Sequence, residues 1–271
     1  MMPRLVTIGV MVILLSAVLP ATGQAPGAIP RTPAGKPNLS GIWQAMNTAN
    51  WDLQGHAARQ GLALELGAIG AEPGGIGVVE GGEIPYLPAA AAMRKQNFEH
   101  RLTEDPEVKC YLPGVPRATY MPYPFQIFQN DKSLAMAYEY DSAFRNIYLK
   151  DPGPPPIDSW MGQSVGRWQG DTLVVDVTGL NDQTWFDRAG DFHSDALHVV
   201  ERYTLSSPNV IDYEATIEDP KTFSRPWKIR MPLYRHVEKN AQLVEFKCVE
   251  FVEDLLYGNI QRNRVSEKEV S

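Results

Sequence analysis

Short runs in which apolar and polar residues alternate, separated by turn residues, fill the chain from residue 124 onward. Alternation with a period of two is typical of β-strands that have one buried face. We expect strands at Pro124–Gln129, Leu134–Tyr140, Phe144–Leu149, Gly166–Trp168, Thr172–Thr178, Leu197–Leu205, Val210–Glu218, Trp227–Arg235 and Leu243–Phe251. With a first strand at Gly41–Trp43, the pattern predicts about ten strands in a mainly β, antiparallel barrel, with a sandwich as the alternative. The near absence of helix between these strands excludes a parallel α/β fold.

Residues 45–105 interrupt this pattern. Ala57–Leu66 and Pro88–Arg101 are rich in helix-forming residues, and they flank a glycine-rich tract at Gly67–Gly82 that we expect to form a flexible flap. The glycines of this tract are no phosphate loop, because the Lys-Ser/Thr ending is missing. We therefore predict a small helical insertion after the first strand, which either covers the barrel mouth as a lid or has no function of its own.

The first 25 residues have the pattern of a signal peptide. Arg4 precedes the uncharged apolar run Leu5–Leu19, and the small residues Ala21, Gly23 and Ala25 follow it. The run is shorter than the roughly 20 residues that span a bilayer, which favours a cleaved signal over a membrane anchor. We expect export to the periplasm or the medium, a linker at 26–38, one barrel domain at 39–260 with its insertion at 45–105, and a polar tail at 261–271.

The charge of the chain limits the classes of partner that it can bind. The formal net charge is −7 and no basic cluster is present, which argues against nucleic acid and, once the signal is removed, against a membrane as partner. We expect a small-molecule ligand or substrate, and nothing in the sequence sets the oligomeric state.

Cys110 and Cys248 are the two cysteines. An even pair in an oxidising compartment predicts a disulfide, and the absence of a CxxC spacing argues against a cysteine-bound metal.

The stretch Asn181–Thr204 gathers more groups able to move a proton than any comparable window. Its first half has the composition of a loop and its second half that of a strand. The catalytic candidates are His193, Asp195, Glu201 and Asp187. Alternation places Glu201 on the apolar, inward face, where a carboxylate costs several kcal/mol unless it is paired or protonated. Glu201 is thus either neutralised by a partner, with Arg230 and Glu214 as candidates for the same network, or retained for chemistry.

Aromatic and polar residues near this stretch are candidates for substrate binding, because large rings in loops stack on ligands. They are Trp185, Arg188, Trp160, Tyr140 and His198. His193 and His198 are five positions apart and would face opposite ways in a strand, and no HExxH spacing appears, so no cofactor is predicted. A divalent metal held by His193 and His198 is the lesser alternative.

Two functions from different classes fit these residues. The first is an exported, metal-independent enzyme that uses His193 with a carboxylate for acid–base chemistry on an aromatic, terpenoid or glycosidic substrate, as a lyase, hydratase, isomerase or hydrolase. The second is a non-catalytic, calycin-like protein that binds a small apolar ligand in its barrel. In the enzyme model the ligand lies at the barrel mouth between Trp185, His193 and Glu201. Trp160 and Tyr140 form the facing wall, and residues 51–56 close over it.

Two resemblances bear on these expectations. Gly41-x-Trp43 resembles the opening motif of lipocalins and other calycins, in which the tryptophan closes one end of the barrel. The stretches Asp105–Ile127, Gly166–Thr204 and Tyr213–Arg235 resemble a family of exported, functionally uncharacterised proteins of soil bacteria such as acidobacteria. The resemblance implies export and a calycin-like barrel, and it implies no catalytic residue. The insertion at 45–105 departs from a compact lipocalin.

Overall fold

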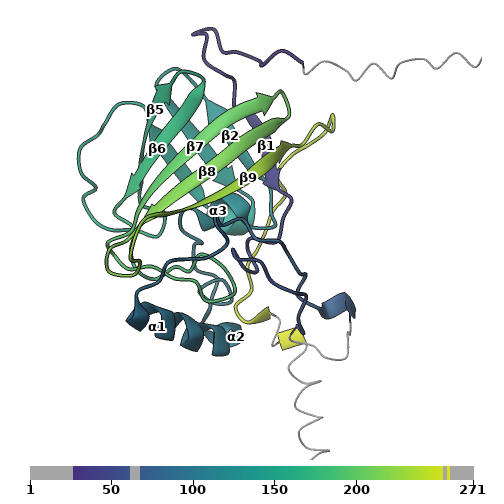
Figure 1. Ribbon diagram of the computed structural model, residues 1–271. Helices are drawn as coiled ribbons and strands as arrows, with labels where there is room; N and C mark the ends of the chain where they lie inside the picture. The colour runs from purple at the N-terminus through teal and green to yellow at the C-terminus, as the bar shows by residue number, and fades with distance from the viewer. Residues whose placement is uncertain (1–26, 62–67, 253–254, 257–271) are drawn as a thin grey trace, which may run out of the picture.

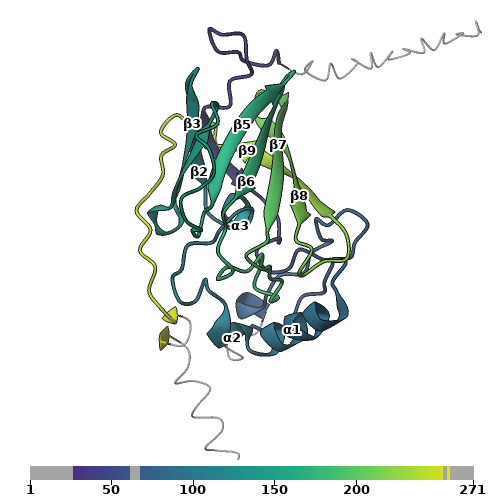
Figure 2. The same ribbon diagram turned by 90° about the vertical axis from the view of Figure 1, so that its left-hand side faces the viewer.

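The computed structural model describes residues 27–61, 68–252 and 255–256. Its centre is a closed barrel of nine strands in chain order (Figures 1 and 2). The strands are β1 (Gly41–Ala45), β2 (Phe125–Gln129), β3 (Ser133–Tyr138), β4 (Phe144–Tyr148), β5 (Gln163–Gln169), β6 (Thr172–Thr178), β7 (His198–Ser207), β8 (Val210–Glu218) and β9 (Trp227–Arg235). The barrel closes because β1 pairs with both β2 and β9. The predicted mainly β barrel is thus confirmed.

One pair of neighbouring strands departs from the expected antiparallel order. β4 and β5 run parallel and share only two register pairs, Ile147↔Ser164 and Tyr148↔Val165. Parallel neighbours require a connection that returns from one end of the sheet to the other. Residues 149–162 make this return, and β4 and β5 are joined along a much shorter length than the antiparallel β7 and β8. We call this short junction the seam.

The named α-helices of the described chain lie between β1 and β2; the first two fall inside the predicted insertion at 45–105, and the third follows it. They are α1 (Pro88–Glu99), α2 (Arg101–Glu104) and α3 (Arg117–Tyr120), and a 3-10 turn, η2 (Tyr140–Ser142), follows β3. α1 and α2 form a layer beyond one end of the barrel, and α3 lies at that same end (Figures 1 and 2). The side chains of α3 are all buried, so this helix helps to close the barrel interior.

The glycine-rich part of the insertion differs from the prediction. The described part of the expected helix Ala57–Leu66 is not helical, because backbone bonds pair His56 with Gly75 and Arg59 with Glu72. Gly77 has a φ of 79° and lies close to the backbone of residues 53–55, so an added Cβ would be 2.5 Å from the backbone nitrogen of Gly55. The tract expected to be a flap therefore packs against residues 54–59.

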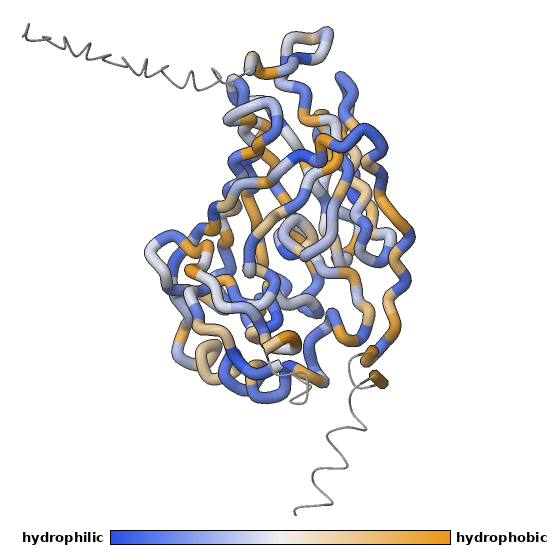
Figure 3. Tube along the Cα trace, turned by 90° about the vertical axis from the view of Figure 1, so that its right-hand side faces the viewer, coloured by the Kyte–Doolittle hydropathy of each residue, from blue (hydrophilic) through white to orange (hydrophobic). Residues whose placement is uncertain are grey.

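The core follows the alternation along the strands, and Figure 3 shows hydrophobic and hydrophilic residues interleaved over the barrel. Trp43 is fully buried, and its indole nitrogen donates to the carbonyl of Leu39 at 2.8 Å. The guanidinium of Arg235 lies over the Trp43 ring, 4.1 Å from its centroid. Trp43 is thus enclosed between the segment before β1 and the last strand.

The C-terminal segment corrects one strand prediction and confirms the disulfide. Leu243–Phe251 forms no strand, because β9 already closes the barrel onto β1. The segment instead runs along the outside of the barrel (Figure 2). There the Phe246 ring packs on those of Tyr123 and Tyr140, and Cys248 forms a disulfide with Cys110.

Several predictions concern residues outside the described part of the chain. They are the signal peptide at 1–25, the rest of the helix predicted up to Leu66, and the polar tail at 261–271. Within the described part, no helix has both the length and the apolar character needed to cross a membrane.

Candidate functional site

A charged pair lies in the barrel interior. Arg145 of β4 donates through Nη2 to Oε2 of Glu201 of β7, and both side chains are almost completely buried. The Nε of Arg145 donates to the Ser164 hydroxyl of β5 at 2.8 Å. The inward orientation predicted for Glu201 is therefore confirmed, and its charge is neutralised by Arg145. Arg230 and Glu214 do not take part, since they pair on the outer face with Asp212 and Lys228.

Two phenols complete the environment of Glu201. The hydroxyls of Tyr203 and Tyr213 donate to its Oε1 at 2.9 and 2.8 Å. Burial, followed by the negative charge of Glu201, raises the pKa of both tyrosines well above the ordinary value. Both phenols therefore keep their protons and act as hydrogen-bond donors at neutral pH. The Nη1 of Arg145 is a buried donor without an acceptor among the described residues.

A pocket of about 420 Å³ opens beside this interior cluster at the seam. Strand β4, the returning connection and the start of β5 line it, with Leu112 at one side. The lining residues are Leu112, Phe144, Arg145, Asn146, Tyr148, Pro155, Pro156, Ile157, Ser159, Trp160, Met161, Gly162, Gln163 and Ser164. Most of them are apolar or aromatic, and a few carry polar groups. This mixture is typical of small-molecule sites, which usually measure about 300–1,000 Å³. We call it the seam pocket.

Trp160 is the largest side chain of the seam pocket. Its ring packs against that of Tyr111, with centroids 4.8 Å apart. Ile157 is largely exposed, so the pocket is open to solvent on that side. Among the residues predicted to bind a substrate, Trp160 is the one that lines this pocket.

His193 is held inside the loop between β6 and β7. Its Nε2 bonds with the Thr184 hydroxyl at 2.6 Å and its Nδ1 with the carbonyl oxygen of Ser194 at 2.9 Å. The ring packs against that of Phe186. Burial lowers the pKa of His193, so the imidazole is neutral at pH 7. His193 and Glu201 share no hydrogen-bond partner among the described residues, so the structure does not assemble the predicted pair.

Asp187 lies in the same loop but joins a different group. One carboxylate oxygen each from Asp52, Asp187 and Asp191 lie within 4.8 Å of one another, and all three residues are buried. The backbone nitrogen of Leu53 donates to Asp187 Oδ2 at 2.8 Å. The segment around residues 51–56 thus packs onto the loop between β6 and β7 at Asp187.

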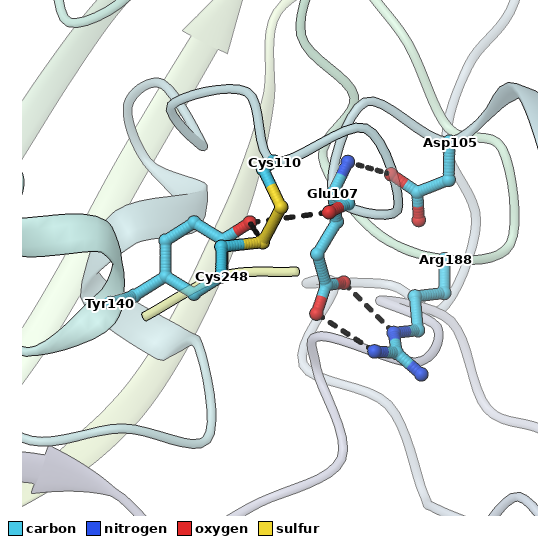
Figure 4. Close-up of a disulfide and its surroundings, with 6 residues drawn as sticks. All are labelled: Asp105, Glu107, Cys110, Tyr140, Arg188 and Cys248. Atoms are coloured by element: carbon cyan, nitrogen blue, oxygen red, sulfur yellow. Dashed lines mark hydrogen bonds and ion pairs between the residues drawn. A yellow bond between two sulfur atoms is a disulfide. The ribbon is translucent and has the colours of Figure 1, made fainter. Parts of the chain in front are cut away.

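Arg188 is used in a second buried ion-pair group (Figure 4). Its Nε and Nη2 each donate to the Glu107 carboxylate at 2.8 Å, and Arg117 reaches the same carboxylate at 2.6 Å. Burial alone would raise the pKa of Glu107, but the charges and hydrogen bonds of Arg188 and Arg117 lower it to about 2. Tyr140 donates to the carbonyl of Glu107 at 3.3 Å and lies beside the disulfide. Arg188 and Tyr140 therefore connect structural segments and do not line the seam pocket.

The remaining predicted residues lie elsewhere. Asp195 is exposed and pairs with Lys221. His198 lies on the outer face of the barrel between Asp176 and Glu218. Trp185 bridges to Phe192 within its own loop. The structure thus distributes the predicted residues over several places, because the loop folds back on itself before β7 begins.

The sequence pattern gave no site role to Arg145, Asp52 or Asp191. The alternation along β4 does indicate an inward-facing Arg145, because Arg145 shares its face of the strand with Ile147, and Ile147 is apolar and buried. The same rule that placed Glu201 inward would have placed Arg145 inward too. Asp52 carried no comparable signal, since its approach to Asp187 depends on how the insertion folds.

Comparisons with known proteins gave no match: no family model, no curated protein and no solved structure is significantly similar to the chain.

Proposed function

We propose that the protein binds a small, uncharged molecule with an aromatic or apolar body in the seam pocket. The observation that carries this proposal is the pocket itself, with its volume of about 420 Å³, its apolar and aromatic lining and the open side at Ile157. Trp160 offers a ring face on which an aromatic or sugar ring can stack. This is the binding-protein alternative raised by the sequence, with the ligand at the barrel wall and not inside the barrel.

The charges of the lining favour an uncharged ligand. Arg145 is the one charged side chain among the described lining residues, and its charge is already compensated by Glu201. An anionic ligand would compete with Glu201 for the same guanidinium, and a cationic ligand would meet no counter-charge. The neutral amides of Asn146 and Gln163 supply hydrogen bonds that can orient hydroxyl or carbonyl groups.

Calorimetric titration tests this proposal with phenols, terpenoids and glycosides as probes. We expect one of these classes to bind, and the variant Trp160→Ala to bind at least about tenfold more weakly, because it removes the stacking surface. Phe128→Ala is the matched control, since Phe128 is an exposed aromatic residue outside the pocket. Equal affinity of both variants, or no binding of any probe, would contradict the proposal.

An acid–base enzyme is the second candidate, and one observation favours it. Arg145 and Ser164 line the seam pocket, and Glu201 with its two phenols lies directly behind Arg145. A bound molecule would thus lie one side chain away from a carboxylate. His193 supports this candidate less, because both of its ring nitrogens are engaged and it does not line the pocket. Turnover of a bound probe, abolished by Tyr213→Phe, would favour the enzyme; binding without turnover would favour the carrier.

Export is also part of the proposal. The Cys110–Cys248 disulfide supports it, because disulfides persist in oxidising compartments. Fractionation of cells expressing the full chain should place the protein outside the cytoplasm, and recovery in the cytoplasm with free thiols would contradict this.

A further inference from the structure

We propose that Asp52, Asp187 and Asp191 bind a hard divalent cation such as Ca²⁺ or Mn²⁺. The three residues come from two segments far apart in the chain, and each contributes one oxygen to a group whose members lie within 4.8 Å of one another. They are 5%, 0% and 0% exposed. Three carboxylates held together out of water repel one another strongly unless a positive charge lies between them.

An oxygen without a donor points to such a charge. Oδ2 of Asp191 is buried and has no hydrogen-bond partner among the described residues, although Oδ1 accepts from Tyr86 at 2.9 Å and from Arg94 at 3.1 Å. Buried carboxylate oxygens are normally satisfied, because an unsatisfied one loses its hydration without compensation. Oδ2 of Asp52 has only distant cationic partners, since the nearest guanidinium nitrogens of Arg59 and Arg94 lie at 3.4 and 3.9 Å.

The charges around the three aspartates leave room for a cation. Ion pairs connect Asp52 and Asp191, with Glu72, to the guanidinium groups of Arg59, Arg94 and Arg101. With Asp187 included, the group holds four carboxylates and three guanidinium groups. One negative charge is left over among these described residues when all four carboxylates are ionised, whereas burial and the neighbouring Asp191 raise the pKa of Asp187 well above its ordinary value and favour a proton there. A proton shared between Asp187 and Asp191 is the competing explanation, and the test must distinguish the two.

The geometry of Asp187 fits the role of a ligand. Its Oδ1 accepts from the backbone nitrogens of Ala189 and Asp191, and its Oδ2 accepts from that of Leu53. Such bonds fix the orientation of a ligating carboxylate. Because each carboxylate oxygen has two lone pairs, Oδ2 keeps one for a cation.

The donor set selects the class of cation. An all-oxygen, carboxylate-rich set suits Ca²⁺, Mg²⁺ and Mn²⁺, whereas zinc sites usually include histidine or cysteine. Mg²⁺ keeps several of its waters and rarely occupies a site built wholly of buried protein ligands, which favours the other two. The cation would fasten the segment of Asp52 to the loop between β6 and β7. Through Arg94, it would also fasten α1 to this end of the barrel.

The experiment uses the full chain, dialysed against a chelator and then titrated calorimetrically with CaCl₂ or MnCl₂ at pH 7.5. We expect one ion per chain. At a hundredfold excess over the dissociation constant, the melting temperature should rise by about 5–10 °C. Asp191→Asn and Asp52→Asn should each weaken binding at least tenfold and abolish the rise. Asp212→Asn, in an exposed ion pair, is the control and should bind like the wild type.

Several outcomes would overturn the proposal. One is the absence of stoichiometric binding; another is binding that Asp191→Asn and Asp52→Asn leave unchanged. A shared proton would appear as an Asp191→Asn variant that is as stable as the wild type, with neither protein responding to cation. If the variants do not fold, wild-type crystals soaked in MnCl₂ test directly whether a cation occupies the site. An anomalous peak between the three carboxylates supports the site, and its absence refutes it.

Discussion

Arg145 and Glu201, 56 residues apart in the chain, meet as an ion pair inside the barrel. Removing one member of such a pair leaves an uncompensated buried charge. We therefore expect Glu201→Gln to lower the free energy of unfolding by about 3–5 kcal/mol in urea titrations. Glu214→Gln, which breaks the outer-face pair with Lys228, should cost much less. The double variant Arg145→Met/Glu201→Leu removes both charges but leaves the hydroxyls of Tyr203 and Tyr213 without their acceptor, so it should recover only part of the loss. A double variant less stable than Glu201→Gln would show that the lost hydrogen bonds outweigh the unpaired charge.

Glu107 should make the protein sensitive to acid. Its pKa is lowered from an ordinary value of 4.5 to about 2, so its stabilising contribution is complete above pH 4.5 and is lost as the pH falls through about 2. Glu107→Gln should lower stability at pH 7 and flatten its decline between pH 4.5 and pH 2, as measured by urea unfolding at each pH. Glu104→Gln, at an exposed pair with Lys109, should follow the wild-type curve.

The burial of His193 predicts a second, smaller dependence of folding stability on pH, in a higher pH range than that of Glu107. Burial lowers its pKa, so the neutral ring stabilises the fold fully above the unfolded pKa of about 6.5. This contribution is lost as the pH falls from there towards the lowered value. We expect the NMR signal of the His193 ring to titrate below pH 6.5, and His193→Asn to lose less stability than the wild type between pH 7 and pH 5. A His193 signal that titrates above pH 6.5 would contradict the burial argument.

The disulfide ties the C-terminal segment to the connection between α2 and α3 across 138 residues of chain. Cys110→Ser/Cys248→Ser should lower the free energy of unfolding by about 2–5 kcal/mol, because the open chain gains entropy when it unfolds. Residues 241–252 should also exchange their amide hydrogens faster, since only the Phe246 ring contacts and the hydrogen bonds from the backbone nitrogens of Val244 to Glu139 and of Phe251 to Val108 would then hold the described part of this segment. Wild-type protein treated with a reductant is the control and should behave like the variant. Unchanged exchange would mean that these contacts hold the segment without the disulfide.

Gly41 is required by the contact between Trp43 and Arg235. An added Cβ at Gly41 would lie 2.0 Å from Nη1 of Arg235, whose side chain covers the Trp43 ring. Gly41→Ala should therefore displace Arg235, lower the melting temperature and change the tryptophan fluorescence. Gly81→Ala also places an alanine at a positive φ, 81° against 144° at Gly41, but meets nothing within 4 Å, so it is the control without a steric contact. Equal losses in both variants would attribute the effect to strain alone.

The sequence by itself indicated the nine strands of the barrel and the faces that they bury, although it also predicted a strand at Leu243–Phe251 that does not form. Alternation placed Glu201 inward and would have placed Arg145 inward, because successive side chains of a strand point to opposite sides and burial selects the apolar side. The disulfide could be predicted too, because two cysteines allow one pairing. In these cases the information is local or combinatorially simple.

The tertiary structure alone decided which of these groups meet. Glu201 pairs with Arg145 because closure of the barrel brings β4 and β7 to face each other across the interior, and no local pattern encodes that distance. The parallel seam, and with it the pocket, follows from the return of residues 149–162 along the barrel. His193 and Asp187 are neighbours in the chain, yet their side chains enter different groups. Asp187 meets Asp52 because the insertion packs on the loop, and such packing depends on the sum of many long-range contacts.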